Sequence, residues 1–179
     1  MFLNWSVRVA NYTGNQMAIR AAVLTISDKG FRGERVDTSG PAVQALLEQA
    51  GITVAHSEII PDEQDSIVSR LMVCCDEMRC DLIVTTGGTG VGPRDVTPEA
   101  TRIVLERELP GFGEAMRMES LKITPHAVIS RALAGIRKHC LIINLPGSPK
   151  AARENLNIVL PALAHAIAKI QGDPSDCAS

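Results

Sequence analysis

Residues 81–100 read DLIVTTGGTGVGPRDVTPEA, in which an apolar run ends in a glycine-rich loop. Residues 81–86 have the continuous apolar character of a strand that is buried on both faces. The loop is followed by Pro98-Glu99-Ala100, which begins a helix because proline is favoured at the first helical position. A buried strand, a glycine-rich loop and a helix in succession are typical of parallel α/β sheets, whose ligands bind beyond the carboxyl ends of the strands.

The rest of the chain repeats this alternation of strands and helices. Further strands are expected at 21–26 and 52–60, and helices at 41–50, 67–78, 98–105 and 111–121. A hairpin is expected from strands at 130–136 and 139–144, followed by a helix over 149–170 that Pro161 breaks or kinks. This order predicts an α/β fold with a doubly wound, largely parallel sheet.

The length and composition fit one folded domain. The chain has 179 residues, of which 45% are hydrophobic and 21% are charged. We expect the domain to span residues 19–172, between an N-terminal extension over residues 1–18 and a C-terminal tail over residues 173–179.

Composition and charge argue against several classes of partner. Aromatic residues make up 3% of the chain and the net charge is −2, which disfavours nucleic-acid binding by stacking or by a basic surface. No apolar stretch approaches the roughly 18 residues that a membrane span needs, and we expect no secretory signal and no membrane partner. Five cysteines without a CxxC pair are typical of free thiols, so we expect a cytoplasmic protein.

The glycine-rich loop has the composition of a phosphate-binding site. Glycines let the backbone approach an anion closely, and threonines add hydroxyl donors. The predicted binding residues of this loop are Thr86, Gly87, Gly88, Thr89 and Gly90. The loop matches neither GxxxxGK[ST] nor GxGxxG, because no lysine follows it and a proline stands in place of the third glycine. The alternative is a connection shaped only for a tight turn.

Two aspartates are expected beside this loop. Asp95 follows it and Asp62 follows the strand at 52–60, so that in a parallel sheet both lie at the same edge. A carboxylate next to a phosphate site requires a cation between the two, and Mg²⁺ bound by one or two carboxylates and the phosphates meets that need. We therefore interpret Asp62 and Asp95 as metal ligands. The alternatives are a helix cap for Asp62 and a turn residue for Asp95.

Two further segments reach the same edge of the predicted sheet. Residues 144–150, NLPGSPK, precede a helix, so that Gly147 and the first helical amides form a second anion cradle. In this cradle Ser148 is the cap and Lys150 is a point charge. Ser27-Asp28 closes the first strand. For residues 144–150, the alternative to an anion cradle is an ordinary connection between strand and helix. For Ser27-Asp28, the alternative to a binding role is a turn.

Five blocks occur in order along the chain. They are IPDE at 60–63, TTGGTG at 85–90 continued by PRDVTPEA at 93–100, PGFG at 110–113, SR at 130–131 and NLPGS at 144–148. In this combination they closely resemble the molybdopterin adenylyltransferases, the MogA/MoaB group that includes the G domain of gephyrin. The resemblance runs from about residue 19 to residue 172.

The resemblance implies a three-layer α/β/α domain with a largely parallel central sheet, assembled as a homotrimer. It implies transfer of the adenylyl group of Mg-ATP to the terminal phosphate of molybdopterin, release of pyrophosphate, and hand-over of the product to the molybdate-insertion enzyme. The family's two essential acids correspond to Asp62 and Asp95, which are therefore the predicted catalytic residues. The other residues assigned to nucleotide and pterin binding are Ser27, Asp28, Asn144, Pro146, Gly147, Ser148 and Lys150.

Two alternatives remain within this resemblance. One is a MoaB-type pterin-binding protein without activity, which Asp62 argues against because some such relatives lack this acid. The other is a scaffold domain, as in gephyrin. Because Phe31 and Phe112 are the aromatic residues of the predicted domain, we expect adenine and pterin to be held by backbone hydrogen bonds and by aliphatic or Met contacts.

Overall fold

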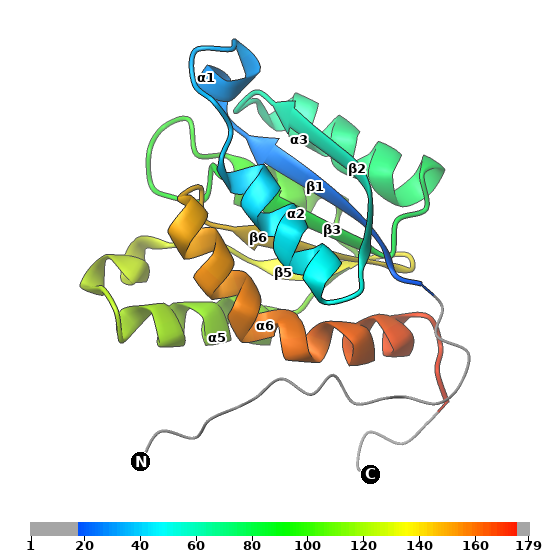
Figure 1. The fold of residues 1–179 in the computed structure, drawn as a ribbon. Helices are drawn as coiled ribbons and strands as arrows, with labels where there is room; N and C mark the ends of the chain where they lie inside the picture. The colour runs from blue at the N-terminus through cyan, green and yellow to red at the C-terminus, as the bar shows by residue number, and fades with distance from the viewer. Residues whose placement is uncertain (1–17, 175–179) are drawn as a thin grey trace.

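A sheet of six strands runs through the computed structural model, which describes residues 18–174 (Figure 1). The strands are β1 Arg20–Ile26, β2 Thr53–Ile60, β3 Leu82–Thr86, β4 Arg107–Glu108, β5 Ala134–Arg137 and β6 Cys140–Leu145. Their order in the sheet is β2-β1-β3-β6-β5-β4. The pairings of β2, β1, β3 and β6 are parallel, whereas β5 pairs antiparallel with both β6 and β4. The sheet is therefore mixed and mostly parallel.

Helices cover both faces of this sheet and complete a three-layer α/β/α fold (Figure 1). One face is covered by α2 Ser39–Gln49, α5 Pro110–Leu121 and α6 Pro149–Ile170. The other face is covered by α3 Gln64–Met72, which continues into the π-helical turn η1 Val73–Glu77, and by α4 Thr97–Val104. The predicted fold class is confirmed.

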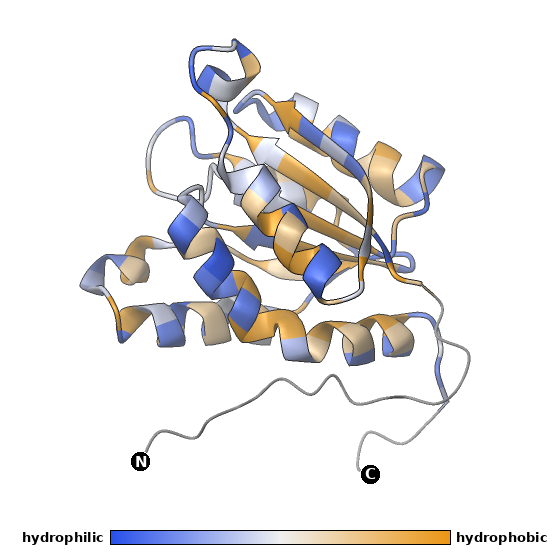
Figure 2. Cartoon of the chain, in the orientation of Figure 1, coloured by the Kyte–Doolittle hydropathy of each residue, from blue (hydrophilic) through white to orange (hydrophobic). Residues whose placement is uncertain are grey.

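Two hydrophobic cores lie between the layers, one on each face of the sheet. In β1, Val23 packs into the core shared with Leu47 of α2, and the next residue, Leu24, packs into the core shared with Ile67 of α3. Successive side chains of a strand point to opposite faces, so the central strands contribute to both cores. Figure 2 shows these strands as hydrophobic segments beneath helices that carry hydrophilic residues. Burial on both faces explains the continuous apolar runs in the sequence.

Most elements agree with those expected from the sequence, with differences around residue 130. The strand expected from Ser130 begins at Ala134, because the N–H groups of Ser130 and Arg131 donate to the carbonyls of Ala127 and Thr89 instead of to a neighbouring strand. Three short elements were not predicted, namely α1 Asp28–Phe31, β4 and the 3₁₀ turn η2 Pro125–Ile129. Each of them is too short for a repeating pattern of hydrophobic residues to be recognised in the sequence.

Pro161 lies inside a continuous helix. The helix α6 runs from Pro149 to Ile170, and Figure 1 shows that its axis changes direction near the middle. Proline has no N–H to donate and crowds the preceding turn, which bends a helix at that place. The predicted kink is confirmed and the predicted break is wrong.

The proposed chain ends are largely outside the described residues. Of the predicted extension over residues 1–18 only Ala18 is described, and of the predicted tail the described part ends at Pro174. Within residues 18–174, no helix has both the length and the apolar character needed to cross a membrane.

Candidate active site

A cavity of about 390 Å³ opens where β3 and β6 end. Its wall combines the loop after β3, the loop after β6, the end of α5, the segment 123–130 and the start of α6. The predicted site residues that line it are Gly88, Thr89, Gly90, Asp95, Pro146 and Gly147. The structure thus brings the glycine-rich loop, one predicted acid and the predicted second wall together around one cavity.

The loop after β3 requires glycine for two reasons, which are its left-handed backbone conformation and the short distance between this loop and its neighbours. The φ angle is +108° at Gly87 and +62° at Gly88. A Cβ atom at Gly87 would lie 2.2 Å from the carbonyl oxygen of Ile26, and one at Gly147 would lie 3.2 Å from Gly87 Cα. Side chains at these positions would push the loops after β1, β3 and β6 apart. The glycines therefore allow the three loops to converge.

Thr86 ties two of these loops together from inside the protein. Its hydroxyl donates to the carbonyl oxygen of Pro146 at 2.7 Å and shares a hydrogen bond of 2.6 Å with Ser39 of α2. The side chain is fully buried. Thr86 therefore positions the loop after β6, and its hydroxyl proton is engaged in that contact.

Arg131 holds the part of the loop that carries Asp95. Its guanidinium donates to the carbonyl oxygens of Gly90 and Asp95, and it pairs with Glu99 at the start of α4. The Asp95 carboxylate accepts a hydrogen bond of 2.8 Å at Oδ2 from the main-chain N–H of Gly92. Its Oδ1 accepts no hydrogen bond from residues 18–174. One oxygen of this cavity-lining carboxylate is therefore available to a ligand.

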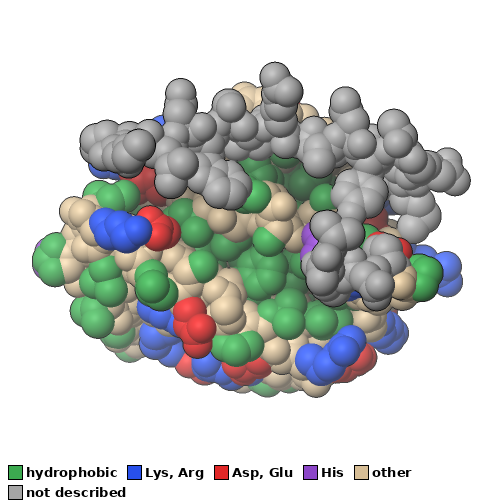
Figure 3. All heavy atoms as spheres, turned by 90° about the horizontal axis from the view of Figure 1, so that it is seen from below, with side chains coloured by type: hydrophobic (Ala, Val, Ile, Leu, Met, Phe, Trp, Pro, Cys, Tyr) green, Lys and Arg blue, Asp and Glu red, His purple; other side chains and the backbone are tan. Residues whose placement is uncertain are grey.

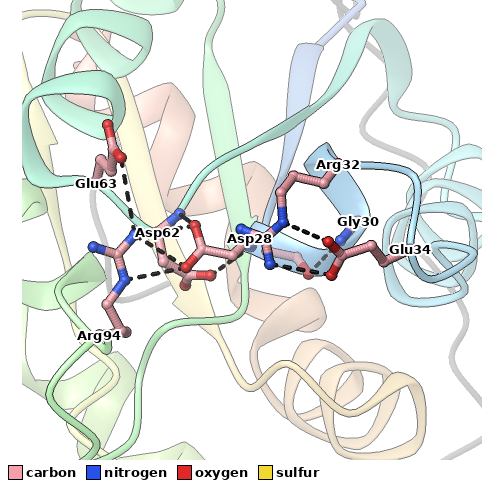
Figure 4. Close-up of polar contacts among 8 residues, drawn as sticks. Asp28, Gly30, Arg32, Glu34, Asp62, Glu63 and Arg94 are labelled. Carbon is pink, nitrogen blue, oxygen red and sulfur yellow. Dashed lines mark hydrogen bonds and ion pairs between the residues drawn. The ribbon is translucent and has the colours of Figure 1, made fainter.

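Asp28 and Asp62 brace each other at the ends of β1 and β2 (Figure 4). The main-chain N–H of Asp28 donates to Asp62 Oδ2 at 2.7 Å, and the main-chain N–H of Asp62 donates to Asp28 Oδ1 at 3.1 Å. The other oxygen of Asp62, Oδ1, accepts no hydrogen bond from the described residues. Because α3 begins without a side-chain cap, the helix-cap alternative for Asp62 is wrong.

Arg94 connects this pair to the loop after β3. Its Nε donates to Asp28 Oδ2 at 3.1 Å and its Nη2 donates to Asp28 Oδ1 at 3.0 Å. Glu63 lies 4.0 Å from the same guanidinium (Figure 4). Charged side chains therefore join the loops that follow β1, β2 and β3.

Burial raises the pKa of the Asp62 carboxyl above its ordinary value. The hydrogen bond from the main chain of Asp28 acts against this effect, and the negative charges of Asp28 and Asp95 add to it. The positive charge of Arg94 lowers the Asp62 pKa. The negative charge of Asp95 therefore acts on the Asp62 carboxyl, although the two side chains follow different strands.

Asp62 and Asp95 each keep one carboxylate oxygen that accepts no hydrogen bond from residues 18–174. Gly88 lies close to Asp62 and Thr97, because a Cβ atom at Gly88 would lie 3.2 Å from Asp62 Oδ1 and 2.3 Å from Thr97 Oγ1. Carboxylate oxygens are the donors that Mg²⁺ prefers, and it commonly takes one or two of them together with substrate phosphates. Within residues 18–174, no three His, Cys, Asp or Glu side chains are arranged to hold a metal by themselves. Phosphate oxygens would be needed to complete the site.

The loop after β6 forms the second wall only in part as predicted. Pro146 and Gly147 line the cavity, and Ser148 caps α6 by accepting a hydrogen bond of 3.5 Å from the N–H of Ala151. Lys150 lies 3.9 Å from Glu154, with 74% of its side chain exposed, and is not among the cavity-lining residues. The point charge predicted at Lys150 is therefore absent from the cavity wall.

Two predicted binding residues lie inside the protein. Asn144 is 0% exposed, and its Nδ2 donates to the hydroxyls of Thr85 and Thr101 at 3.0 Å each. Ser27 is buried and caps α1 by accepting a hydrogen bond of 3.1 Å from the N–H of Gly30. The Asn144 amide nitrogen is therefore engaged inside the core, and the cap formed by Ser27 agrees with the turn alternative for that residue.

The sequence interpretation missed the opposite wall of the cavity. Arg117 and Ser120 of α5, His126 of η2 and Asn155 of α6 line it. Arg117 is the one Lys or Arg among the lining residues of this cavity, and its Nη1 donates to the carbonyl of Ala132 at 2.7 Å. The sequence pattern of α5 predicts a helix. It does not indicate which residues of that helix face the cavity, because the other cavity walls come from distant parts of the chain.

The cavity wall contains no Phe, Tyr, Trp or Met side chain among its described lining residues. Phe31 is 59% exposed on α1, and Phe112 packs against the hydrophobic core. The apolar part of the wall includes Ile123 and Ile129. Aliphatic contacts are thus available to a bound ring, whereas the expected Met contacts are not.

The chain matches the family described as "Probable molybdopterin binding domain" over residues 22–165. The chain belongs to this family. Its members include curated relatives and solved structures of high similarity, so the predicted resemblance is confirmed.

Three relatives illustrate the similarity. A molybdopterin adenylyltransferase from Helicobacter pylori (strain J99) is 50% identical over 157 residues, which are 87% of this chain and 89% of that protein. Gephyrin from Dictyostelium discoideum is 46% identical over 162 residues, which are 85% of this chain and 22% of gephyrin. The molybdopterin biosynthesis enzyme MoaB from Thermus thermophilus has a crystal structure with a TM-score of 0.82 and 51% identity, covering 88% of this chain and 99% of that one.

Proposed function

We propose that this chain is a molybdopterin adenylyltransferase of molybdenum cofactor biosynthesis, with ATP and molybdopterin as its substrates. The supporting observation is the cavity in which the glycine-rich loop, Asp95 and the wall of Pro146 and Gly147 meet. It occurs in a chain that is 50% identical to an enzyme of that name.

The reaction joins two phosphates. An oxygen of the terminal phosphate of molybdopterin attacks the α-phosphorus of ATP, the bond from that phosphorus to the bridging oxygen breaks, and pyrophosphate leaves with the electron pair. In this proposal the amides of residues 88–90 bind phosphate oxygens and orient the two groups in line. Asp62 and Asp95 are the residues that would hold Mg²⁺. Bound Mg²⁺ would neutralise charge on the departing pyrophosphate.

Arg117 and the aliphatic wall are the proposed contacts of the pterin substrate. Arg117 supplies positive charge to a cavity wall that also includes Asp95 and Glu154. Molybdopterin carries a phosphate and a flat ring system, which need a cation and apolar or hydrogen-bonding surfaces respectively. Arg117, Ile123 and Ile129 provide both kinds of contact on the side that faces the glycine-rich loop.

The alternative function is a pterin-binding protein without transferase activity. Asp62 favours the enzyme, because its Oδ1 lies next to Gly88 of the glycine-rich loop and accepts no hydrogen bond from the described residues. A scaffold role is suggested by the similarity to gephyrin, of which this chain covers 22%.

We further propose a homotrimer in a reducing, cytoplasmic compartment. Large apolar side chains are exposed along the end of α5 and through η2, and these are Met118, Leu121, Ile123, Val128 and Ile129. Figure 3, which views the molecule from below, where Figure 1 places α5 and α6, shows hydrophobic side chains gathered between charged ones. Contact between copies would bury such surface. Cys74, Cys75, Cys80 and Cys140 are free and buried, which agrees with a reducing compartment.

The decisive experiment is incubation with ATP, Mg²⁺ and molybdopterin, followed by detection of pyrophosphate and of the adenylylated pterin. We expect both products in equal amounts. Binding of molybdopterin without either product would favour the pterin-binding alternative, and failure to bind it would contradict both functions.

A further inference from the structure

Arg94 and Asp95 are neighbours in the loop after β3 but make different contacts. Asp95 lines the cavity and keeps Oδ1 free, whereas Arg94 is bound to Asp28 through two nitrogen atoms, at 3.1 and 3.0 Å. Both oxygens of Asp28 are occupied, since Oδ1 also accepts the main-chain N–H of Asp62. Arg94 therefore holds a positive charge against one acid of the site.

Arg94 is the only basic side chain in residues 18–174 that forms an ion pair with Asp28, and neither Asp62 nor Asp95 forms one. It also lies within 4.0 Å of Glu63 (Figure 4). Asp28 and Glu63 thus both face one guanidinium, whose positive charge also acts on Asp62. Without this positive charge the carboxylates would repel one another.

We propose that Arg94 is an exchangeable counter-ion of the metal and nucleotide site. In the absence of nucleotide it balances Asp28. When MgATP enters, Arg94 leaves Asp28, whose negative charge is then free to attract the divalent cation at Asp62 and Asp95, and Arg94 binds a phosphate of the nucleotide. The inference rests on the proposed function, since it assigns Arg94 to the same metal and phosphate site.

The chemistry of the guanidinium supports such an exchange. Its planar fork of N–H donors fits a carboxylate and a phosphate equally well, through two parallel hydrogen bonds. The Arg94 side chain is 57% exposed, whereas that of Asp28 is 24% exposed. Because the guanidinium is largely exposed, solvent screens this ion pair, and a two-bond contact with a phosphate compensates for its loss.

The acids keep their places without Arg94. Asp28 and Asp62 are positioned by their two reciprocal main-chain hydrogen bonds, neither of which involves Arg94. Departure of the guanidinium would therefore leave the Asp28 carboxylate in position beside Asp62, whose Oδ1 is already free. The exchange needs movement of one exposed side chain and no rearrangement of the strands.

The test compares metal binding with nucleotide binding in Arg94→Gln, using Mn²⁺ alone as the metal probe and MgATP as the nucleotide, each titrated without pterin. We expect Arg94→Gln to bind Mn²⁺ about three- to fivefold more tightly, because the competing cation is gone. We expect it to bind MgATP about tenfold more weakly, because a charge-assisted contact to phosphate is lost. Arg94→Lys keeps a positive charge but not the fork, so it should bind Mn²⁺ as the wild type does and MgATP with intermediate affinity.

Arg32→Gln is the matched control. Arg32 is 52% exposed and pairs with Glu34 on the loop that follows α1, close enough for its charge to interact with that of Asp28 without an ion pair between them. It should change neither affinity by more than about twofold, since only the general field is altered. Opposite shifts for the two ligands in Arg94→Gln distinguish an exchanged counter-ion from a merely structural residue, whose loss would weaken both.

Three results would overturn the proposal. These are unchanged or weaker Mn²⁺ binding by a folded Arg94→Gln, unchanged MgATP binding by the same variant, or equal effects in Arg32→Gln. If Arg94→Gln does not fold, a wild-type MgATP affinity in Arg94→Lys would overturn it. The titrations contain no pterin, so they test the role of Arg94 separately from catalysis. If the proposed transferase function fails instead, the wild type binds Mn²⁺ and MgATP but transfers no adenylyl group.

Discussion

Asp28 and Asp62 each donate their main-chain N–H to the carboxylate of the other, at 2.7 and 3.1 Å. These residues follow β1 and β2, which lie side by side in the sheet. The two hydrogen bonds orient the Asp62 carboxylate before any ligand binds, and they leave its Oδ1 free beside Gly88. The site is therefore preorganised around a carboxylate that is partly buried, and this has a measurable cost in stability.

Asp62→Asn should increase the free energy of unfolding at pH 8 while it abolishes adenylyl transfer. Burial raises the pKa of Asp62 in the folded state, so the ionised form is less favourable in the folded than in the unfolded chain. Asparagine removes that charge and keeps an oxygen that accepts the N–H of Asp28. We expect a gain below about 1 kcal/mol, because the carboxyl is only partly buried and solvent screens it.

The pH dependence of this gain has a definite sign. A carboxyl whose folded pKa is raised destabilises the protein increasingly as the pH rises from its ordinary pKa through the raised value. Well below both values the carboxyl is neutral in both states, so the difference between wild type and Asp62→Asn should vanish at about pH 2. Denaturant titrations at the two pH values measure it. A variant that is less stable than the wild type at pH 8 contradicts the prediction.

Asp95→Asn should reduce turnover far more than it weakens pterin binding. The asparagine oxygen can still accept the N–H of Gly92, so the loop keeps its conformation, but the free carboxylate oxygen no longer carries negative charge for a metal. We expect kcat to fall about 100-fold, measured as pyrophosphate release, with the dissociation constant of molybdopterin nearly unchanged. Asp65→Asn on the exposed start of α3 is the control and should retain wild-type kcat. Equal turnover by Asp95→Asn and wild type would exclude a catalytic role for Asp95.

Local sequence patterns predicted the layers of the fold and the glycine-rich loop. Apolar runs such as residues 81–86 and helical periods such as that of α2 depend on near neighbours in the chain, which a sequence displays directly. Gly87 was predicted for the same reason, because a run of glycines after a strand signals an unusual backbone before any partner is known.

Distant contacts decided the residues that the sequence interpretation misplaced. Asn144 follows an apolar strand and has the chemistry of a ligand contact, but β3 and α4 supply two hydroxyls that receive its N–H groups inside the core. Arg117 lies on a helix whose exposed and buried positions look ordinary, and it borders the cavity only because η2 and α6 fold next to it. Neither outcome follows from residue type or spacing.

Arg117→Gln should weaken the binding of molybdopterin and leave that of MgATP unchanged. Arg117 is the one Lys or Arg lining the cavity, and glutamine can replace its hydrogen bond to Ala132 but not its charge. We expect the KM for molybdopterin to rise about tenfold, because losing one charge-assisted hydrogen bond to a phosphate weakens binding by about that factor. Arg153→Gln on the exposed side of α6 should have no effect. A larger effect on ATP than on pterin would place the nucleotide at this wall instead.

Val128→Glu should dissociate the proposed trimer without unfolding the chain. Val128 is 68% exposed and lies among the exposed apolar residues of η2, so a carboxylate there is harmless to a monomer but unfavourable in a buried contact. Sedimentation velocity should show a trimer for the wild type and a monomer for the variant, with the same helical content. Val36→Glu is the matched control, because Val36 is 82% exposed before α2 and should leave the trimer intact. A wild-type monomer would exclude the assembly, and a trimeric Val128→Glu would exclude this surface.

Gly87→Ala should be the most damaging single methyl addition in the loop after β3. The φ angle of +108° disfavours any side chain, and the new Cβ would lie 2.2 Å from the carbonyl oxygen of Ile26, which belongs to β1 and cannot move without disturbing the sheet. We expect a loss of at least about 3 kcal/mol in the free energy of unfolding. Denaturant titration at equal protein concentration measures this loss.

Gly33→Ala separates the effect of backbone strain from that of the clash. Gly33 has a φ of +72°, but apart from its chain neighbours no atom lies within 4 Å of the position that a Cβ would take, so alanine there should cost only about 1 kcal/mol. Because the two variants share a left-handed backbone and differ in available space, their difference reports how closely the loops after β1 and β3 approach. Equal losses in the two variants would mean that the loop after β3 moves to accommodate a side chain, and the glycines would then not be needed to bring the three loops together around the cavity.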